Sequence, residues 1–205
     1  PALNKNIHLL ADHLFRHESG KMVAVLTRLF GMHNLELAED VMQEAFAKAL
    51  REWTFGLPPN PSGWLMLTAK NKAIDVIRRE RYSKEFAHET GMLLRSEYTT
   101  APVVEKLFME YEIQDSQLRM IFACCHPALA PADQIALTLK TCSGFGVQEI
   151  AAALLSNAET IKKRLQRAKN TIIEQKINFD IPLGADLKNR LDIVLQTLYL
   201  LFNEG

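Results

Sequence analysis

Two histidines near the start of the chain have a spacing that would suit the binding of a metal ion. His13 and His17 stand four residues apart, as two zinc ligands on one helical face do. However, Leu14 follows His13 where a zinc peptidase helix carries its glutamate, and Arg16 would repel a cation. We therefore interpret the pair as structural or surface residues and not as a metal site.

The three cysteines form no metal or disulfide pattern. Cys124 and Cys125 are adjacent and Cys142 stands alone, so there is no disulfide framework, and His126 beside them completes no CxxC-type zinc spacing. A glycine-rich phosphate loop and a nucleophile elbow are also missing. We predict a protein without catalysis, metal or cofactor, whose thiols stay reduced and buried in the cytoplasm.

The composition is that of a soluble globular protein of one to two domains. The 205 residues are 48% hydrophobic and 23% charged, with 24 basic residues balancing 24 acidic ones. No apolar run approaches the ~20 residues of a membrane span, and the first residues lack the features of a secretory signal. Disordered tails, disulfide scaffolds, membrane proteins and globally basic DNA binders are thereby excluded.

The neutral total conceals a segregation of charge. Residues 70–84 and residues 159–176 each hold six basic and two acidic side chains, whereas residues 36–52 hold five acidic and two basic ones. A charged helix face is commonly just solvated. Two basic helices and one acidic helix in one chain are less easily explained by solvation, and any binding to phosphate would have to come from such local patches.

Residues 146–174 predict a helix-turn-helix, with helices over 147–155 and 158–176. Each helix carries one apolar stripe, and small Ala151 lets the two cross closely. Ser156 and Asn157 can cap the second helix, but Leu155 stands where glycine is usual, so we expect an unusual turn. An ordinary surface hairpin is the alternative. The second helix directs outward a set of residues suited to a major groove, namely Glu159, Thr160, Lys163, Arg164 and Arg167.

Helical periodicity elsewhere predicts an all-α fold of two helical domains, residues 1–82 and 115–178. In the first domain we expect two short helices over 7–15 and 20–30, then helices over 37–53 and 62–82, the last with Ser62 at its N-cap. Residues 83–114 form an acidic linker that could hold a docked helix. Order resumes at Asp115, and Pro131 starts a further helix. Residues 179–205 end in a helix over 186–202 that is apolar on most sides and must be buried, either against the second domain or against a missing C-terminal partner.

Two stretches resemble the sigma factors of bacterial RNA polymerase. LAEDVMQEAFAKALREW (37–53) with NPSGWLMLTAKNKAIDVIRRERY (60–82) is similar to sigma region two, and PADQIALTLKTCSGFGVQEIAAALLSNAETIKKRLQRAK (131–169) to region four. The likeness is greatest to the extracytoplasmic-function (ECF) group. FACCHPALAP (122–131) and LDIVLQTLYLLFNEG (191–205) resemble a subgroup with a C-terminal helical, TPR-like extension, so residues 179–205 are expected to begin that extension.

The resemblance implies core RNA polymerase and promoter DNA as partners, with the chain's own extension or an anti-sigma factor as a regulator. The acidic helix would dock on the polymerase clamp helices through Asp40, Gln43, Glu44 and Lys48. The next helix, with loop 54–62 cradling an extruded base, would read the minus-ten strand through Asn71, Asp75, Arg78, Arg79 and Tyr82. The minus-thirty-five duplex would meet Ser156, Asn157, Glu159, Thr160, Lys163, Arg164 and Arg167.

A polymerase-independent repressor or activator with a helical sensor domain remains the alternative. Such a protein would explain the helix-turn-helix of residues 146–174 but not the acidic helix followed by LTAKNKAIDVIRRERY (67–82). Binding to core polymerase distinguishes the two, because a plain repressor binds duplex DNA unaided.

Overall fold

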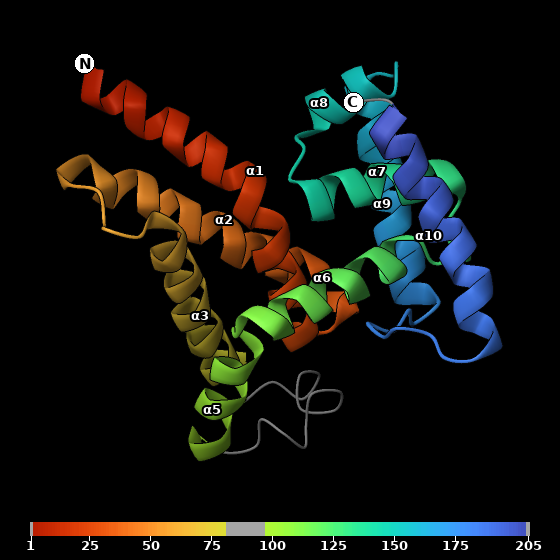
Figure 1. The fold of residues 1–205 in the computed structure, drawn as a ribbon, viewed down its shortest axis with the longest axis horizontal. Helices are drawn as coiled ribbons and strands as arrows, with labels where there is room; N and C mark the ends of the chain where they lie inside the picture. Colours follow the sequence, from red (N-terminus) through yellow and green to blue (C-terminus); the bar gives the residue numbers. More distant parts are fainter. Residues whose placement is uncertain (1, 81–96, 204–205) are drawn as a thin grey trace.

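The structure, a computed structural model, describes residues 2–80 and 97–203, and this part of the chain is helical without a strand (Figure 1). The all-α prediction is therefore confirmed. Tyr82, one of the predicted minus-ten residues, lies outside the described residues. The helices are α1 (Ala2–Phe30), α2 (Leu35–Glu52), α3 (Pro61–Glu80), α5 (Glu97–Leu107), α6 (Glu110–Cys124), α7 (Pro131–Ser143), α8 (Val147–Ala153), α9 (Ala158–Glu174) and α10 (Ala185–Asn203), with short 3₁₀ turns η1 (Met32–Asn34) and η2 (Trp53–Phe55).

Helix α1 is one continuous helix, so the prediction of two short helices broken near Gly20 was wrong. Gly20 is buried inside the helix. A methyl group at this position would collide with the backbone carbonyl of Cys142 at the end of α7. The glycine therefore serves the close approach of two helices and does not break the first of them.

Helices α2 and α3 complete the first half of the molecule, beside α1 (Figure 1). The predicted apolar stripe of α2 is buried, including Phe46 and Trp53. Trp53 meets Trp64 of α3 edge to face, with ring centroids 5.6 Å apart, so both rings serve the packing of α2 on α3. The N-cap of α3 is Asn60 and not Ser62, since the Gly63 N–H donates to Asn60 Oδ1 at 2.9 Å.

The predicted linker contains ordered helix beyond residue 97. Helix α5 docks on α3, where Lys70 Nζ donates to Glu105 Oε1 at 3.0 Å and Val104 is fully buried. Helix α6 begins at Glu110, five residues before the expected start at Asp115. Carboxylates in its first turn suit the positive end of the helix dipole. Arg28 of α1 holds this turn by contacting Glu112 at 2.8 Å.

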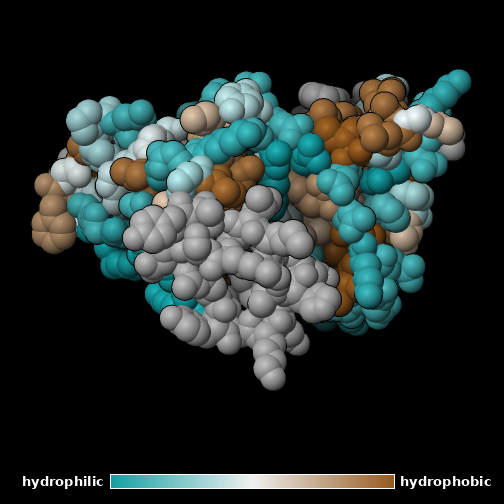
Figure 2. Space-filling view, turned by 90° about the horizontal axis from the view of Figure 1, so that it is seen from below, coloured by the Kyte–Doolittle hydropathy of each residue, from teal (hydrophilic) through white to brown (hydrophobic). Residues whose placement is uncertain are grey.

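The second half consists of α6 to α10, with α7, α8 and α9 enclosing the helix-turn-helix core. Helix α7 ends where Gly144 adopts a left-handed conformation, with φ of 68°. Helix α10 packs on α6 and α7 through Val194 and Thr197, but one face of it is open to solvent. Its open face comprises Leu191, Leu195 and Tyr199, which are 41%, 54% and 68% exposed. Packing on the second half thus covers one side of this apolar helix and leaves the other open, and Figure 2 shows hydrophobic side chains gathered at this end of the molecule.

The two halves pack against each other along α1, which contacts α6 and α7 as well as α2 and α3. Ion pairs reinforce the contact. Arg16 of α1 pairs with Glu149 of α8, and Lys169 of α9 contacts Glu39 of α2 at 2.8 Å. The N–H of Gly146 together with Arg16 lowers the pKa of Glu149, so this carboxylate stays charged at neutral pH. We call this the closed arrangement, in which the two halves pack on each other along α1 and are joined by these ion pairs.

The turn of the helix-turn-helix is strained at Leu155. This residue has φ of 45°, in the left-handed region where glycine is favoured, and its side chain is 95% exposed. The unusual turn expected from the sequence is thus a leucine held in a glycine conformation. The Ser156 N–H donates to the Ala151 carbonyl at 2.8 Å, which keeps the turn tight.

Leu155→Gly should stabilise the protein, because it removes the left-handed strain and uncovers no core. We expect the free energy of unfolding to rise by about 1 kcal/mol and the Tm by about 2–4 °C, measured by calorimetry. The control is Leu154→Gly at the neighbouring half-buried position, which packs on the core and should destabilise. A lower Tm for Leu155→Gly would show that its exposed side chain stabilises the turn.

Candidate polymerase- and DNA-binding surfaces

The predicted polymerase-binding residues lie together on the solvent side of α2. Asp40, Gln43, Glu44 and Lys48 are all exposed, while the opposite side of the helix packs on α1. Glu44 pairs with Lys72 of α3, and Lys48 lies over the ring of Trp64, 5.7 Å from its centroid. Within the described part of the chain Asp40 has no basic partner. This surface therefore offers carboxylate to a basic partner.

One edge of this α2 surface lies beside the second half of the molecule. Gln43 and Lys140 of α7 line the same narrow crevice, together with Glu39. A partner that covers α2 fully must therefore approach close to α7. The closed arrangement restricts access to the surface at this edge.

The predicted minus-ten residues that the structure describes line the outer face of α3. Asn71, Asp75, Arg78 and Arg79 are exposed. Asp75 Oδ1 lies 3.9 Å from Arg78 Nη1, so this carboxylate can orient the arginine. Among the described residues Arg79 has no acidic partner, whereas Lys70 and Lys72 are paired with Glu105 and Glu44. The two arginines are thus the cations of α3 best placed to meet phosphate.

The loop between α2 and α3 presents apolar side chains to solvent. Phe55 is 95% exposed and Leu57 is 50% exposed. Both precede Asn60, whose side chain caps α3 and fixes where the loop ends. Proteins that bind single-stranded nucleic acid combine exposed aromatic rings, on which bases stack, with cations that neutralise phosphates, and this loop and α3 carry both kinds of side chain.

The first turns of α9 present the residues predicted for duplex DNA. Asn157 is the N-cap, with its Oδ1 accepting from the Thr160 N–H at 2.8 Å, as expected. Glu159 and Lys163 are exposed, and Ser156, Thr160 and Arg164 are half-buried. The core side of the helix is closed by Ile161, Leu165, Ala168 and Ile172. The N-terminal half of α9 is therefore rigidly held and open on its polar side, as a groove-reading helix must be.

Arg167 differs from the other predicted DNA residues because it has a structural partner. Its guanidinium donates two hydrogen bonds to the carboxylate of Asp133, at 2.7 and 2.6 Å. Asp133 is buried at the start of α7, and its charge raises the pKa of Arg167 further. The sequence pattern placed Arg167 outward correctly, but it contained no signal for a carboxylate 34 residues earlier. This arginine joins α9 to α7 whether or not it also reaches DNA.

Lys169 is a further cation of α9 that the sequence analysis did not single out. It contacts Glu39 at 2.8 Å and Glu36 at 3.3 Å, both on α2. Burial opposes its charge, but its hydrogen bonds to these carboxylates hold the pKa of Lys169 above its usual value. Helix α9 of the second half is thereby joined to the acidic helix α2 of the first half.

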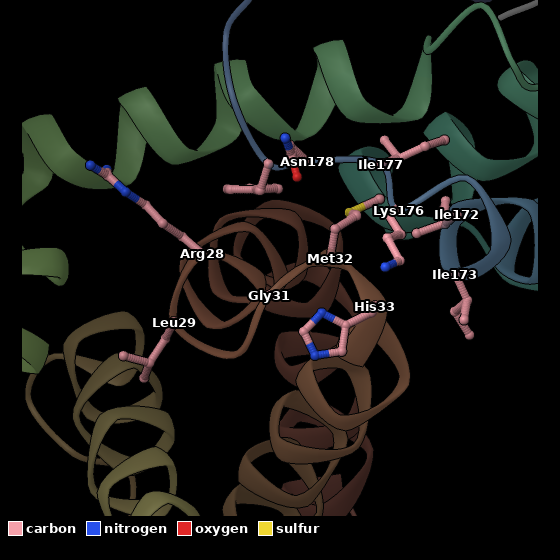
Figure 3. A pocket seen from close by; sticks show the side chains of 11 residues that line it. Arg28, Leu29, Gly31, Met32, His33, Ile172, Ile173, Lys176, Ile177 and Asn178 are labelled. Carbon is pink, nitrogen blue, oxygen red and sulfur yellow. The ribbon is translucent and has the colours of Figure 1, made fainter. Parts of the chain in front are cut away.

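A pocket of about 580 Å³ lies at the same junction. Figure 3 shows its lining side chains, which include Arg28 of α1 and His33 of η1 together with Ile172 and Ile173 of α9 and Lys176, which follows that helix. Its walls come from both halves of the molecule, so the pocket exists only while the halves are closed.

The described residues hold no cluster of three or more histidine, cysteine or acidic side chains able to bind a metal. His13 and His17 stack with ring centroids 4.4 Å apart on the exposed side of α1. Within the same residues, no helix is long and apolar enough to cross a membrane.

The described residues thus place a helix-turn-helix, an exposed arginine-bearing α3 face and an acidic α2 face on one helical chain. The chain matches the family described as Sigma-70 region 2 over residues 14–82 and that described as Sigma-70, region 4 over residues 119–172. The chain therefore belongs to the sigma-70 family of sigma factors and is of the ECF type, as the resemblance predicted.

Relatives with known sequences support this assignment. An uncharacterized protein of Rhizobium meliloti is 36% identical over 184 residues, which cover 89% of this chain and 43% of the relative. A probable ECF RNA polymerase sigma factor, SigI, of Mycobacterium tuberculosis is 26% identical over 80% of this chain and 54% of its own length. The ECF RNA polymerase sigma factor SigE of Mycolicibacterium smegmatis is 27% identical over 78% of this chain and 59% of its own length.

The chain thus spans about half the length of the curated relatives it matches. No solved structure matches it.

Arg167→Met should destabilise the fold, because it leaves the buried Asp133 carboxylate without its bidentate partner. We expect the free energy of unfolding to fall by about 1–3 kcal/mol, measured by urea denaturation. The matched control is Lys163→Met, which removes an exposed charge from the same helix and should change the stability by less than about 0.5 kcal/mol. Equal stabilities for the two variants would contradict a structural role for Arg167.

Proposed function

We propose that this protein binds core RNA polymerase and directs it to promoters, without making or breaking a bond itself. The observation that carries the proposal is that three distinct surfaces occur on one chain of the sigma-70 family. These are an acidic helix face at α2, an arginine-bearing face with an exposed ring at α3, and a groove-type helix at α9. The names of two relatives as ECF RNA polymerase sigma factors support it.

In this proposal the α2 surface provides polymerase binding. Asp40 and Glu44 face solvent on adjacent turns, so their carboxylates can receive arginine or lysine side chains of the polymerase. Lys72 already pairs with Glu44, and a partner cation would have to displace it. Asp40, which has no basic partner among the described residues, is the stronger candidate for the first contact.

The α3 surface would hold the opened minus-ten strand. Phe55 can stack on an extruded base, while Arg78 and Arg79 neutralise phosphates along the helix. Opening the duplex costs a few kcal/mol, which stacking of about 1–3 kcal/mol per base can offset.

The α9 surface would bind the minus-thirty-five duplex, with Lys163 and Arg164 reaching guanine edges or phosphates. Each site alone is weak, and attachment to polymerase raises the effective concentration of the other.

The closed arrangement must open before both promoter elements are bound. The two elements lie about 25 base pairs apart, roughly 85 Å along B-form DNA. A compact chain of 205 residues has a radius of gyration of about 17 Å and is roughly 45 Å across. The pairs from Lys169 to Glu36 and Glu39 and from Arg16 to Glu149 would therefore separate on promoter binding.

A further part of the proposal concerns regulation. The open apolar face of α10 is the kind of surface that a C-terminal helical extension or an anti-sigma protein would cover. The relatives are longer than the part that this chain matches, which favours the extension.

Removing charge from α9 and from α2 should affect different steps. Lys163→Ala with Arg164→Ala should weaken binding to the upstream promoter element roughly tenfold to a hundredfold and leave polymerase affinity unchanged. Asp40→Ala with Glu44→Ala should weaken polymerase binding and spare DNA contacts. The measurements are co-purification with core polymerase and run-off transcription from a promoter library.

Lys162→Ala is the control for the α9 change, since it removes an exposed charge from the same helix outside the predicted set. Intact transcription with both double variants would overturn the assigned roles. Duplex binding in the absence of polymerase, with no polymerase complex, would instead support the repressor alternative.

Lys169→Met should loosen the closed arrangement, because Glu36 and Glu39 would lose the cation that joins them to α9. We expect a larger radius of gyration in small-angle scattering and faster binding to core polymerase. Lys162→Met removes a neighbouring charge that makes no contact with α2 and should change neither quantity. An unchanged radius for Lys169→Met would show that apolar packing along α1 holds the halves closed without this pair.

A further inference from the structure

The thiols of the second half form a cluster that the binding surfaces do not use. Cys124 is the last residue of α6 and is fully buried, and Cys142 lies in the last turn of α7 and is partly exposed. The Thr141 hydroxyl lies 3.1 Å from Cys124 Sγ and 3.6 Å from Cys142 Sγ. Both sulfur atoms therefore contact one oxygen, and the cysteines are neighbours although 18 residues separate them.

We propose that Cys142 and Cys124 form a dithiol that hydroperoxides oxidise to a disulfide, with Cys142 as the reacting thiol and Cys124 as the resolving one. Cys142 is the accessible member, and Cys124 lies behind it in the interior. A thiol on a partly exposed residue with a second thiol within reach is the arrangement of redox-sensitive cysteine pairs.

The electrostatic environment agrees with this order of reaction. The hydrogen bond from Cys124 lowers the pKa of the Cys142 thiol, and Thr141 adds to the effect against the burial of the sulfur. The same hydrogen bond, together with burial, raises the pKa of Cys124 well above its usual value. Cys142 is thus the member that is more readily a thiolate, which is the nucleophilic form.

The reaction balances with peroxide as the oxidant. The Cys142 thiolate attacks one peroxide oxygen, so an S–O bond forms, the O–O bond breaks, and the departing hydroxide takes a proton to become water. The Cys124 sulfur then attacks the Cys142 sulfenic sulfur, and its thiol proton leaves with the hydroxyl group as a second water. Two thiols lose two electrons in total, and the peroxide gains them.

Cys125 is unsuited to either role, although it is adjacent to Cys124. Its sulfur lies 3.9 Å from the Thr138 hydroxyl and packs with Phe122 and Val194, in the small core under α10. Burial raises the pKa of Cys125, so it remains a thiol. It provides a matched control inside the same protein.

The disulfide would act on the contact between the two halves. Disulfide formation draws the sulfurs to about 2.05 Å and therefore moves the end of α7 toward α6. The carbonyl of Cys142 packs against Gly20 of α1 without room for a methyl group, and Gly144 packs similarly close to Ser19. A shift at Cys142 is therefore transmitted to α1, and we expect oxidation to loosen the closure.

The test is peroxide treatment of the full chain followed by thiol counting and peptide mapping. The three free thiols of the wild-type protein should fall to one, with a cross-linked peptide pair containing Cys124 and Cys142 that dithiothreitol releases. Cys125→Ser should form the same disulfide. Cys142→Ser should not react, and Cys124→Ser should stop at a sulfenic or sulfinic acid on Cys142.

Circular dichroism checks that each variant is folded. An unreacted Cys142 in the folded wild-type protein, or a cross-link through Cys125, would overturn the proposal. Small-angle scattering of the oxidised protein tests the coupling. Oxidation should increase the radius of gyration of the wild type and of Cys125→Ser, and it should leave that of Cys142→Ser unchanged. A disulfide with an unchanged radius would refute the link to α1.

Discussion

Helix α1 packs on α2, α3, α6 and α7, and its contact with α7 limits how the rest of the molecule can be arranged. At Gly20 the backbones come so close that no side chain fits between the helix and the Cys142 carbonyl. Around this point α1 packs on α2 and α3 on one side and on α6 and α7 on the other. Apolar contacts along α1 bring the two halves together, and ion pairs at the edge of this contact favour one orientation of the halves.

The ion pairs across the junction use residues that belong to the predicted binding surfaces or adjoin them. Lys169 shares α9 with the residues expected to bind duplex DNA, and Glu36 and Glu39 share α2 with those expected to bind polymerase. In the proposed function, nucleic acid and polymerase would therefore compete with the chain's own opposite charges. The same segregation of charge that is proposed to serve binding stabilises the closed arrangement.

Two local features show how the fold accommodates residues that break the usual pattern. Leu155 adopts a left-handed conformation that glycine would adopt without strain, and the helix-turn-helix still forms because α8 and α9 bury their stripes against α7. Arg167 follows the outward pattern of a DNA-binding residue, yet it satisfies the buried Asp133. In both cases tertiary packing outweighs the local preference.

The sequence by itself determined the helical class, the helix-turn-helix and the α2 and α3 faces, because a period of 3.6 residues and segregated charge are local properties, and its resemblance to sigma factors predicted the family. It misjudged Gly20 as a break and started α6 at Asp115. The tertiary structure alone decided the partners of Arg167 and Lys169, the closure along α1 and the pairing of Cys142 with Cys124. Each of these joins residues far apart in the chain, and no spacing along a sequence records which helix faces meet when it folds.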